Sequence, residues 1–276
     1  MSRYSIGNAA GTRAADITIW QVSDPPGDAV TFERLLASGQ QLPAWLPQLL
    51  MTLYDGQDPG TAAGWARRIA DSFGQAPFEV VHDWQARTVV PLILRACGLT
   101  APEPVTDQPS PGEAAGADLQ RMHARAAAGE RLGEADWRAA IEPALRTLYQ
   151  QAYGYAEAYA TARASAIAYA HANDFSESGA IQFADSYAKM STDSNRKSYA
   201  ESNAVANAAV LAAAYASGDA QAYADSYPFA LVHACAHACA NQADQAGDEA
   251  TTQAERRQAA YTRLAEGLAD SLARFG

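Results

Sequence analysis

The residues best suited to chemistry form a short run near the end of the chain. In His233-Ala-Cys235-Ala-His237-Ala-Cys239, two histidines and two cysteines alternate with alanine. On a helix, His233 and His237 would be neighbours, and two imidazoles at this spacing can bind a transition metal when a third ligand comes from elsewhere. On a strand, all four side chains would line one face. The four residues are candidate metal ligands, unless they merely continue the surrounding alanine pattern as partly buried side chains.

Tyrosines and acids between residues 155 and 227 form a second group of candidates. Small residues beside aromatic ones can leave a pocket for a flat or hydrophobic ligand. The candidate ligand-binding residues are Tyr159, Tyr169, His171, Asp185, Tyr187, Tyr215, Asp225 and Tyr227. Carboxylates at matching places of a repeat, including Glu157 and Glu201, could also serve a dinuclear metal site. The alternative is that the tyrosines fill a thin core and the acids lie in solvent.

No catalytic motif accompanies these candidates, so no catalytic residue is predicted. The chain has neither a Gly-x-Ser-x-Gly elbow nor a phosphate-binding loop nor a dinucleotide fingerprint. This favours a binding or assembly protein whose repeated region forms a scaffold or a ligand-binding surface. Two alternatives stay open. One is an enzyme of bacterial specialised metabolism, metal-dependent through His233 and His237, and the other is a self-stacking solenoid.

The repeat is the strongest architectural signal. The segment at residues 155–187 recurs at 199–227, with Ala-Asp-Ser-Tyr at 184–187 and again at 224–227. Alanine also occupies every even position from Ala156 to Ala172. Alternation is typical of a strand, whereas alanine favours helices. The sequence predicts a mainly α-helical bundle built on a duplicated helical hairpin with an approximate twofold axis. The alternative is a β-solenoid-like middle region flanked by helices.

Composition divides the chain into three parts. Residues 1–100 read as an N-terminal helical region, and residues 101–113 hold four prolines and no periodicity, which is typical of a linker. Residues 114–276 contain the repeat and end in an amphipathic helix over 250–275, which we expect to cap the repeated region. Its apolar stripe consists of Tyr261, Leu264, Leu268, Leu272 and Phe275.

The net charge and the composition of the chain limit the kinds of partner that it can bind. A formal charge of −11 over 276 residues argues against nucleic acid, because binding phosphates requires clustered lysine and arginine. No stretch is apolar enough to span a membrane. Three cysteines are too few for a disulfide framework. We expect a cytoplasmic bacterial protein that binds another protein or a small hydrophobic or aromatic ligand, and the closely packing alanines also predict a homo-oligomer, most simply a homodimer.

Overall fold

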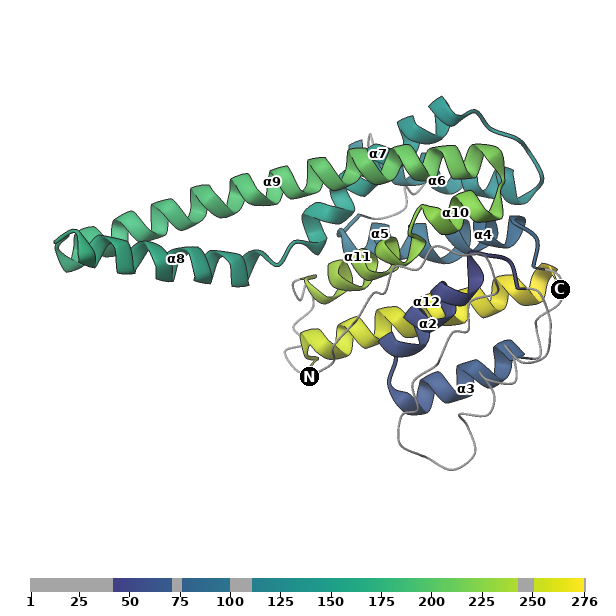
Figure 1. The fold of residues 1–276 in the computed structure, drawn as a ribbon, viewed down its shortest axis with the longest axis horizontal. Helices are drawn as coiled ribbons and strands as arrows, with labels where there is room; N and C mark the ends of the chain where they lie inside the picture. Colours follow the sequence, from purple (N-terminus) through teal and green to yellow (C-terminus); the bar gives the residue numbers. More distant parts are fainter. Residues whose placement is uncertain (1–41, 71–75, 100–110, 243–250, 276) are drawn as a thin grey trace, which may run out of the picture. The chain divides into compact units, whose positions relative to one another are not determined.

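All regular secondary structure in the described part of the chain is helical. The computed structural model describes residues 42–70, 76–99, 111–242 and 251–275 (Figure 1). The predicted mainly α-helical bundle is confirmed. The alternative of a β-solenoid-like middle region is wrong, because the alanine ladder forms a helix, and the self-stacking solenoid loses its structural basis with it.

The described residues, all between 42 and 275, form one compact unit. Its helices are α2 (Leu46–Gly56), α3 (Pro59–Ala70), α4 (Glu79–Trp84), the π-helical turn η1 (Gln85–Val89), α5 (Val90–Ala96), α6 (Pro111–Ala127), α7 (Glu134–Ala152), α8 (Tyr155–Ala172), α9 (Glu177–Ser217), α10 (Ala220–Asp225), α11 (Pro228–Ala240) and α12 (Gln253–Phe275). Residues 101–110 of the predicted linker lie outside the described residues. Its last three residues, 111–113, belong to α6. Helices on both sides of that segment pack together.

Helix α12, which corresponds to the predicted capping helix, packs against helices from the first half of the chain. Trp65 Nε1 on α3 donates a hydrogen bond to the carbonyl of Ala265 at 2.7 Å. Trp84 Nε1 on α4 donates to the carbonyl of Leu264 at 3.0 Å. These bonds satisfy two indole N–H groups that would otherwise be buried without partners. They also fix α3 and α4 to neighbouring residues of α12.

Two glycines allow the close approach of these helices. A β-carbon added at Gly267 of α12 would overlap the side chain of Thr88 in η1, and one added at Gly56 of α2 would overlap the ring of Tyr261. The absence of a side chain at both positions brings η1 and α2 directly onto α12. Tyr261 is thereby held in one place, where its hydroxyl meets a histidine of α11.

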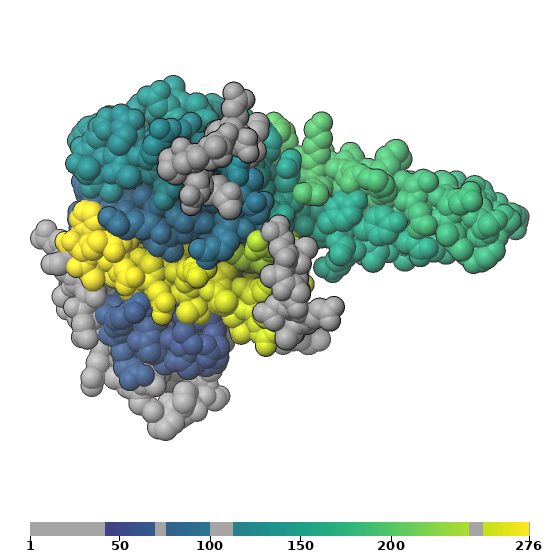
Figure 2. All heavy atoms as spheres, turned by 180° about the vertical axis from the view of Figure 1, so that it is seen from behind, coloured from purple at the N-terminus to yellow at the C-terminus, as the bar shows by residue number. Residues whose placement is uncertain are grey.

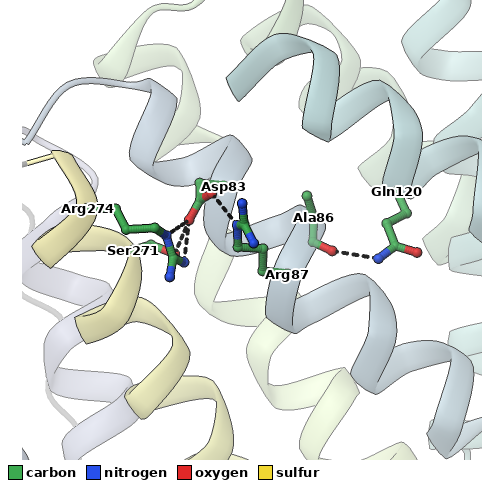
Figure 3. A network of polar contacts seen from close by, with 6 residues as sticks. All are labelled: Asp83, Ala86, Arg87, Gln120, Ser271 and Arg274. Carbon is green, nitrogen blue, oxygen red and sulfur yellow. Dashed lines mark hydrogen bonds and ion pairs between the residues drawn. The ribbon is translucent and has the colours of Figure 1, made fainter. Parts of the chain in front are cut away.

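A buried carboxylate ties α4 to α12 (Figure 3). Asp83 is 5% exposed and accepts hydrogen bonds from Arg87 at 2.8 Å, Ser271 at 2.8 Å and the Nε of Arg274 at 2.9 Å. Burial alone would raise the pKa of Asp83, but these hydrogen bonds and the positive charge of Arg274 outweigh it, and the pKa lies below its usual value. The carboxylate therefore stays charged and paired.

The π-helical turn η1 interrupts the helix between α4 and α5. Gln120 Nε2 on α6 donates to the carbonyl of Ala86 at 3.0 Å (Figure 3). A π-helical turn widens the backbone and can free a carbonyl from its ordinary partner. The glutamine of α6 thus satisfies the backbone at the irregular turn and attaches α6 to η1.

Helix α8 and the first part of α9 form an antiparallel hairpin that we call the arm, residues 155–198. The arm extends beyond the other helices of this unit, and Figure 2 shows it from behind. The turn between its helices begins after Ala172, and Ser176 caps α9 by accepting a hydrogen bond from the N–H of Gly179 at 3.3 Å.

The alternating alanines of α8 form two separate stripes along the helix, and within each stripe alanine recurs every four residues. One stripe, at residues 158, 162, 166 and 170, is half-buried to buried, and Ala166 and Ala170 are 4% and 0% exposed. The other, at residues 156, 160, 164, 168 and 172, is exposed. Residues two apart lie about 200° apart around a helix, so a period of two places alanine on opposite faces. Helical packing accounts for the first stripe, and nothing in the described residues covers the second.

A matching stripe of small residues runs along α9. Its buried members are Ala180, Ala184, Ala188, Thr192, Ala200, Ala204, Ala208 and Ala212. A stripe of period four turns by about 40° per step around a helix of 3.6 residues per turn. Successive sections therefore face different partners, first α8 and then α7. The missing position is Arg196, which donates to the carbonyl of Gln150 at 3.0 Å, where α7 ends.

The pseudo-twofold pair of hairpins predicted from the repeat is not confirmed. Helix α9 runs without a break from Glu177 to Ser217 through the segment between the two copies. The second copy does turn at Gly218, whose φ is +65°, but its next helix, α10, ends after six residues. The two copies thus share one long helix instead of forming four equivalent ones.

Candidate ligand-binding pocket

A pocket of about 930 Å³ lies where α7, α8, α9, α11 and α12 meet. Its floor and walls come from helix faces that are fixed by their own packing, so the side chains that line it are held by secondary structure. The volume lies in the range that small-molecule sites occupy, about 300–1,000 Å³. The pocket is therefore the first place to look for a function.

The wall from α9 carries polar side chains four residues apart. Tyr199, Asn203 and Asn207 follow one another along the helix and line the pocket. The amide of Asn207 donates to the hydroxyl of Tyr149 on α7 at 2.9 Å, and the amide of Asn203 donates to the carbonyl of Tyr199 at 2.8 Å. With the amide groups held in this way, their oxygens can accept hydrogen bonds from a ligand.

The wall from α11 carries the two histidines of the sequence motif. His233 and His237 both line the pocket, one turn apart, and Phe229 lies one turn before them. Tyr227 stands at the start of α11 and is 63% exposed. Its ring lies 5.7 Å from that of Phe229, measured between centroids. The first turn of α11 thus gives the pocket an aromatic end.

The opposite end, which we call the polar end, carries amide and charged side chains together with the ring and hydroxyl of Tyr199. Asn241 follows α11, and its amide donates to the carbonyl of Gln151 at 3.1 Å, while Gln253 of α12 donates to the Asn241 oxygen at 2.6 Å. These hydrogen bonds connect the end of α7, the end of α11 and the start of α12. Glu157 from the first turn of α8 and Arg257 from α12 supply the charged groups that line the pocket.

His233 is oriented by a buried tyrosine. Its Nδ1 lies 2.5 Å from the hydroxyl of Tyr261, and Tyr261 is 5% exposed. Burial, and then the neighbouring His237, lower the pKa of His233. Burial, and then Arg257, lower the pKa of His237. Both imidazoles are therefore neutral at pH 7, and each can donate or accept a hydrogen bond.

The cysteines of the motif are separate from its histidines. Cys235 is fully buried on the other side of α11, and Cys239 is partly buried. Burial raises the pKa of Cys97 to about 12, with a further contribution from Cys239. Among the described residues, no three histidine, cysteine, aspartate or glutamate side chains are arranged to bind a metal ion. A metal site on His233, His237, Cys235 and Cys239 stays a prediction that this arrangement does not support.

Most of the predicted ligand-binding residues lie on the arm and not at the pocket. Asp185 forms an ion pair with Arg163 at 2.5 Å, and the Tyr159 hydroxyl donates to the same carboxylate at 3.4 Å. Tyr169 and Tyr187 are 58% and 43% exposed and flank the ring of Phe183. Two further residues, His171 and Asp225, are exposed. Of the eight predicted residues, the structure brings only Tyr227 to the pocket.

Tyr215 belongs to a buried aromatic cluster that the sequence did not reveal. Its ring lies against Trp137, His82 and His123 at centroid distances of 5.1, 5.3 and 4.9 Å. The Nδ1 atoms of the two histidines are 3.0 Å apart. Burial lowers the pKa of His82 to about 4, and burial, then His82, lowers that of His123 well below its usual value. Both imidazoles are neutral and hydrogen-bonded to each other.

Comparisons with models of protein families, with curated proteins and with solved structures found no match to this chain. The pocket is therefore interpreted from its own geometry. Within the described ranges, no helix combines the length and the apolar character that crossing a bilayer requires.

Sequence reasoning considered Glu157 only as a metal ligand and missed the other residues that complete the pocket. They are Tyr149, Tyr199, Asn203, Asn207, Phe229, Asn241, Gln253 and Arg257. One signal was present, because a tyrosine and two asparagines follow one another at intervals of four on the predicted helix face. The other residues come from helices far apart in the chain, and no local pattern joins them.

Proposed function

We propose that the protein binds a small molecule in the pocket between α7, α8, α9, α11 and α12. The observation that carries the proposal is the lining of this pocket, which combines aromatic rings with hydrogen-bonding side chains held on fixed helix faces. Small-molecule sites typically pair apolar walls with a few placed polar groups. The repeated segments contribute Glu157, Tyr199, Asn203, Asn207 and Tyr227 to this lining.

Filling the pocket tests this proposal. Ala230 lines the pocket on α11, and Ala230→Trp would occupy part of its volume without removing a polar group. Ala164→Trp makes the same change on the exposed face of α8 and is the matched control. In a thermal-shift screen against a library of small metabolites, we expect ligands that stabilise the native protein and the control but not Ala230→Trp. Stabilisation of all three proteins to the same degree would contradict the proposal.

An enzyme is the second candidate, favoured by the contact between His233 and Tyr261. A neutral histidine oriented by a buried hydroxyl at the edge of a pocket can accept a proton from a bound substrate. Once a ligand is known, its chemical conversion by the native protein and not by His233→Gln would support catalysis. Tight binding of an unchanged ligand by both proteins would favour the binding function.

The arm offers an exposed apolar surface for assembly with another protein chain. Five exposed large apolar side chains lie on it, namely Tyr169, Phe175, Ile181, Tyr187 and Met190. We propose a protein partner or a second copy for this surface, and light scattering of the purified protein distinguishes a monomer from a homodimer. The three free thiols agree with a reducing compartment such as the bacterial cytoplasm.

A further inference from the structure

The chemistry of the pocket changes along its length. Tyr227 and Phe229 lie at the first turn of α11, and Asn241 follows its last residue. The axis of α11 therefore separates the aromatic end from the polar end by about 20 Å at 1.5 Å per residue. The hydrogen bond from Gln253 to Asn241 places the start of α12 at the polar end. Arg257 follows Gln253 by one turn of the same helix.

Arg257 is the positive group of that end. It lies close enough to His237 to contribute to the lowering of its pKa. In the part of the chain that the structure describes, no carboxylate lies within ion-pair distance of its guanidinium, although the protein carries a formal charge of −11. Glu157 faces the same pocket from another wall and is likewise without an ion pair among these residues. The guanidinium remains available to a ligand.

We infer that the ligand is an elongated aromatic molecule with an anionic head group, its rings against Tyr227 and Phe229 and its head beside Arg257. The inference rests on the proposed function and specifies its ligand class. Aromatic rings prefer edge or offset contacts with other rings, which the first turn of α11 provides. A guanidinium binds carboxylate and sulfonate groups through charge-assisted hydrogen bonds. The asparagine oxygens of α9 suit an N–H or O–H donor between these ends.

Two fluorescent probes separate the head group from the rings. One is 6-(p-toluidino)naphthalene-2-sulfonate, an elongated aromatic anion with a bridging N–H and a terminal sulfonate, and the other is 2-(p-toluidino)naphthalene, its neutral parent. We expect the anion to bind the native protein with one site per chain and more tightly than its parent. The difference should shrink as salt is raised, because salt screens the charge of an exposed guanidinium.

Variants assign the effect to single side chains. Arg257→Gln should weaken binding of the anionic probe about tenfold and leave the neutral probe unchanged, since only the anion loses a charge-assisted bond. Arg257→Lys should restore part of the loss. Glu157→Gln should have the opposite effect and tighten the anion, because it removes a negative charge from the same pocket. These positions are exposed, so circular dichroism and thermal melts should match those of the native protein.

The exposed large apolar side chains of the arm could also bind such probes, and a variant of the arm tests this. Tyr187→Ser combined with Met190→Ser removes two of these side chains without touching the pocket. We expect this variant to bind both probes as the native protein does. Probe binding that follows the arm variant and ignores Ala230→Trp would overturn both the inference and the proposed function.

A different result overturns the inference alone. If Ala230→Trp abolishes both probes but Arg257→Gln leaves the anion unaffected, the pocket binds ligands without recognising an anionic head. The proposed function would then stand. Tighter binding of the neutral parent than of the anion by the native protein would lead to the same conclusion.

Discussion

The core and the arm are held together by different kinds of side chain. Helices α2 to α5 and α12 pack through tryptophan, leucine and isoleucine, and Trp84, Leu49 and Leu268 are at most 1% exposed. In the arm, residues 155–198, every buried residue is alanine or threonine. The larger apolar side chains of the arm lie at its surface, where Met190 is 66% exposed.

This difference indicates where the stability of the fold resides. Burial of an aliphatic side chain stabilises a protein by about 1.5–3 kcal/mol, and an alanine offers only a methyl group. The arm gains from close helix contact and from bonds along its edges, such as those between Tyr155 and Asp193 at 2.8 Å and Lys189 and Asp193 at 2.6 Å. We expect the arm to open before the core does.

A cavity in the core should produce the largest effect. Leu268 is fully buried on α12, so Leu268→Ala removes apolar contacts that the surrounding helices cannot replace. We expect the free energy of unfolding to fall by about 3 kcal/mol, as typical for buried leucine. Urea unfolding followed by circular dichroism measures it. A loss much smaller than this would show that α12 contributes less to the core than its burial indicates.

Acidification should weaken the helices around the two buried histidines. The pKa of His82 is about 4 when folded and returns to 6.5 when unfolded, so the unfolded chain binds a proton first as the pH falls. The stability from the neutral imidazole is full above pH 6.5 and is lost toward pH 4. Between pH 6.5 and 5 we expect a loss of about 2 kcal/mol. Urea unfolding at several pH values measures it, and His82→Gln should flatten the profile over this range.

A larger side chain in the alanine stripe should loosen the arm and spare the core. Ala184 is fully buried between α9 and α8, so Ala184→Leu forces the helices apart and should cost about 1–2 kcal/mol. Hydrogen exchange should accelerate across residues 155–198 with little change in α12. Ala164→Leu on the exposed face of α8 is the matched control, and exchange should stay unchanged there. Equal acceleration in α12 would show that arm and core unfold together.

Loss of an edge ion pair should produce the smallest effect. The side chains of Arg163 and Asp185 are 37% and 47% exposed, and ion pairs in solvent contribute little. Arg163→Gln should leave the global melting temperature nearly unchanged in physiological salt. The variant should accelerate exchange only at residues near 163 and 185, and more so in low salt. A clear drop in the melting temperature would show that the pair does more than its exposure implies.

Much of the helical structure could be predicted from the sequence, and the exceptions have physical causes. The stripe from Tyr261 to Leu272 predicts α12, because its leucines recur on one face. The two separate hairpins predicted from the repeat are not confirmed, because α9 runs unbroken through the segment between the copies, where no proline or glycine lies between Ala180 and Gly218 to end a helix. Similarity between two segments does not require a turn between them.

The candidate site was less predictable. His233 and His237 share a turn of helix, so their spacing revealed them, and the structure does bring both to the pocket. The pairing of His82 with His123 joins residues 41 positions apart, and neither has a neighbour that marks it. Arg257 resembles any other surface arginine in sequence. Only the packing of α12 against α11 places it beside His237.

The stripe of α9 has a consequence for insertions and deletions. The residues that meet α8 and those that line the pocket belong to one unbroken helix, about 60 Å long at 1.5 Å per residue. One residue inserted near Asn195 would turn one set against the other by about 100°. The alanines that pack against α8 would then face solvent, while Asn203 would still line the pocket. The number of residues in the middle of α9 is therefore more tightly constrained than the identity of its exposed side chains.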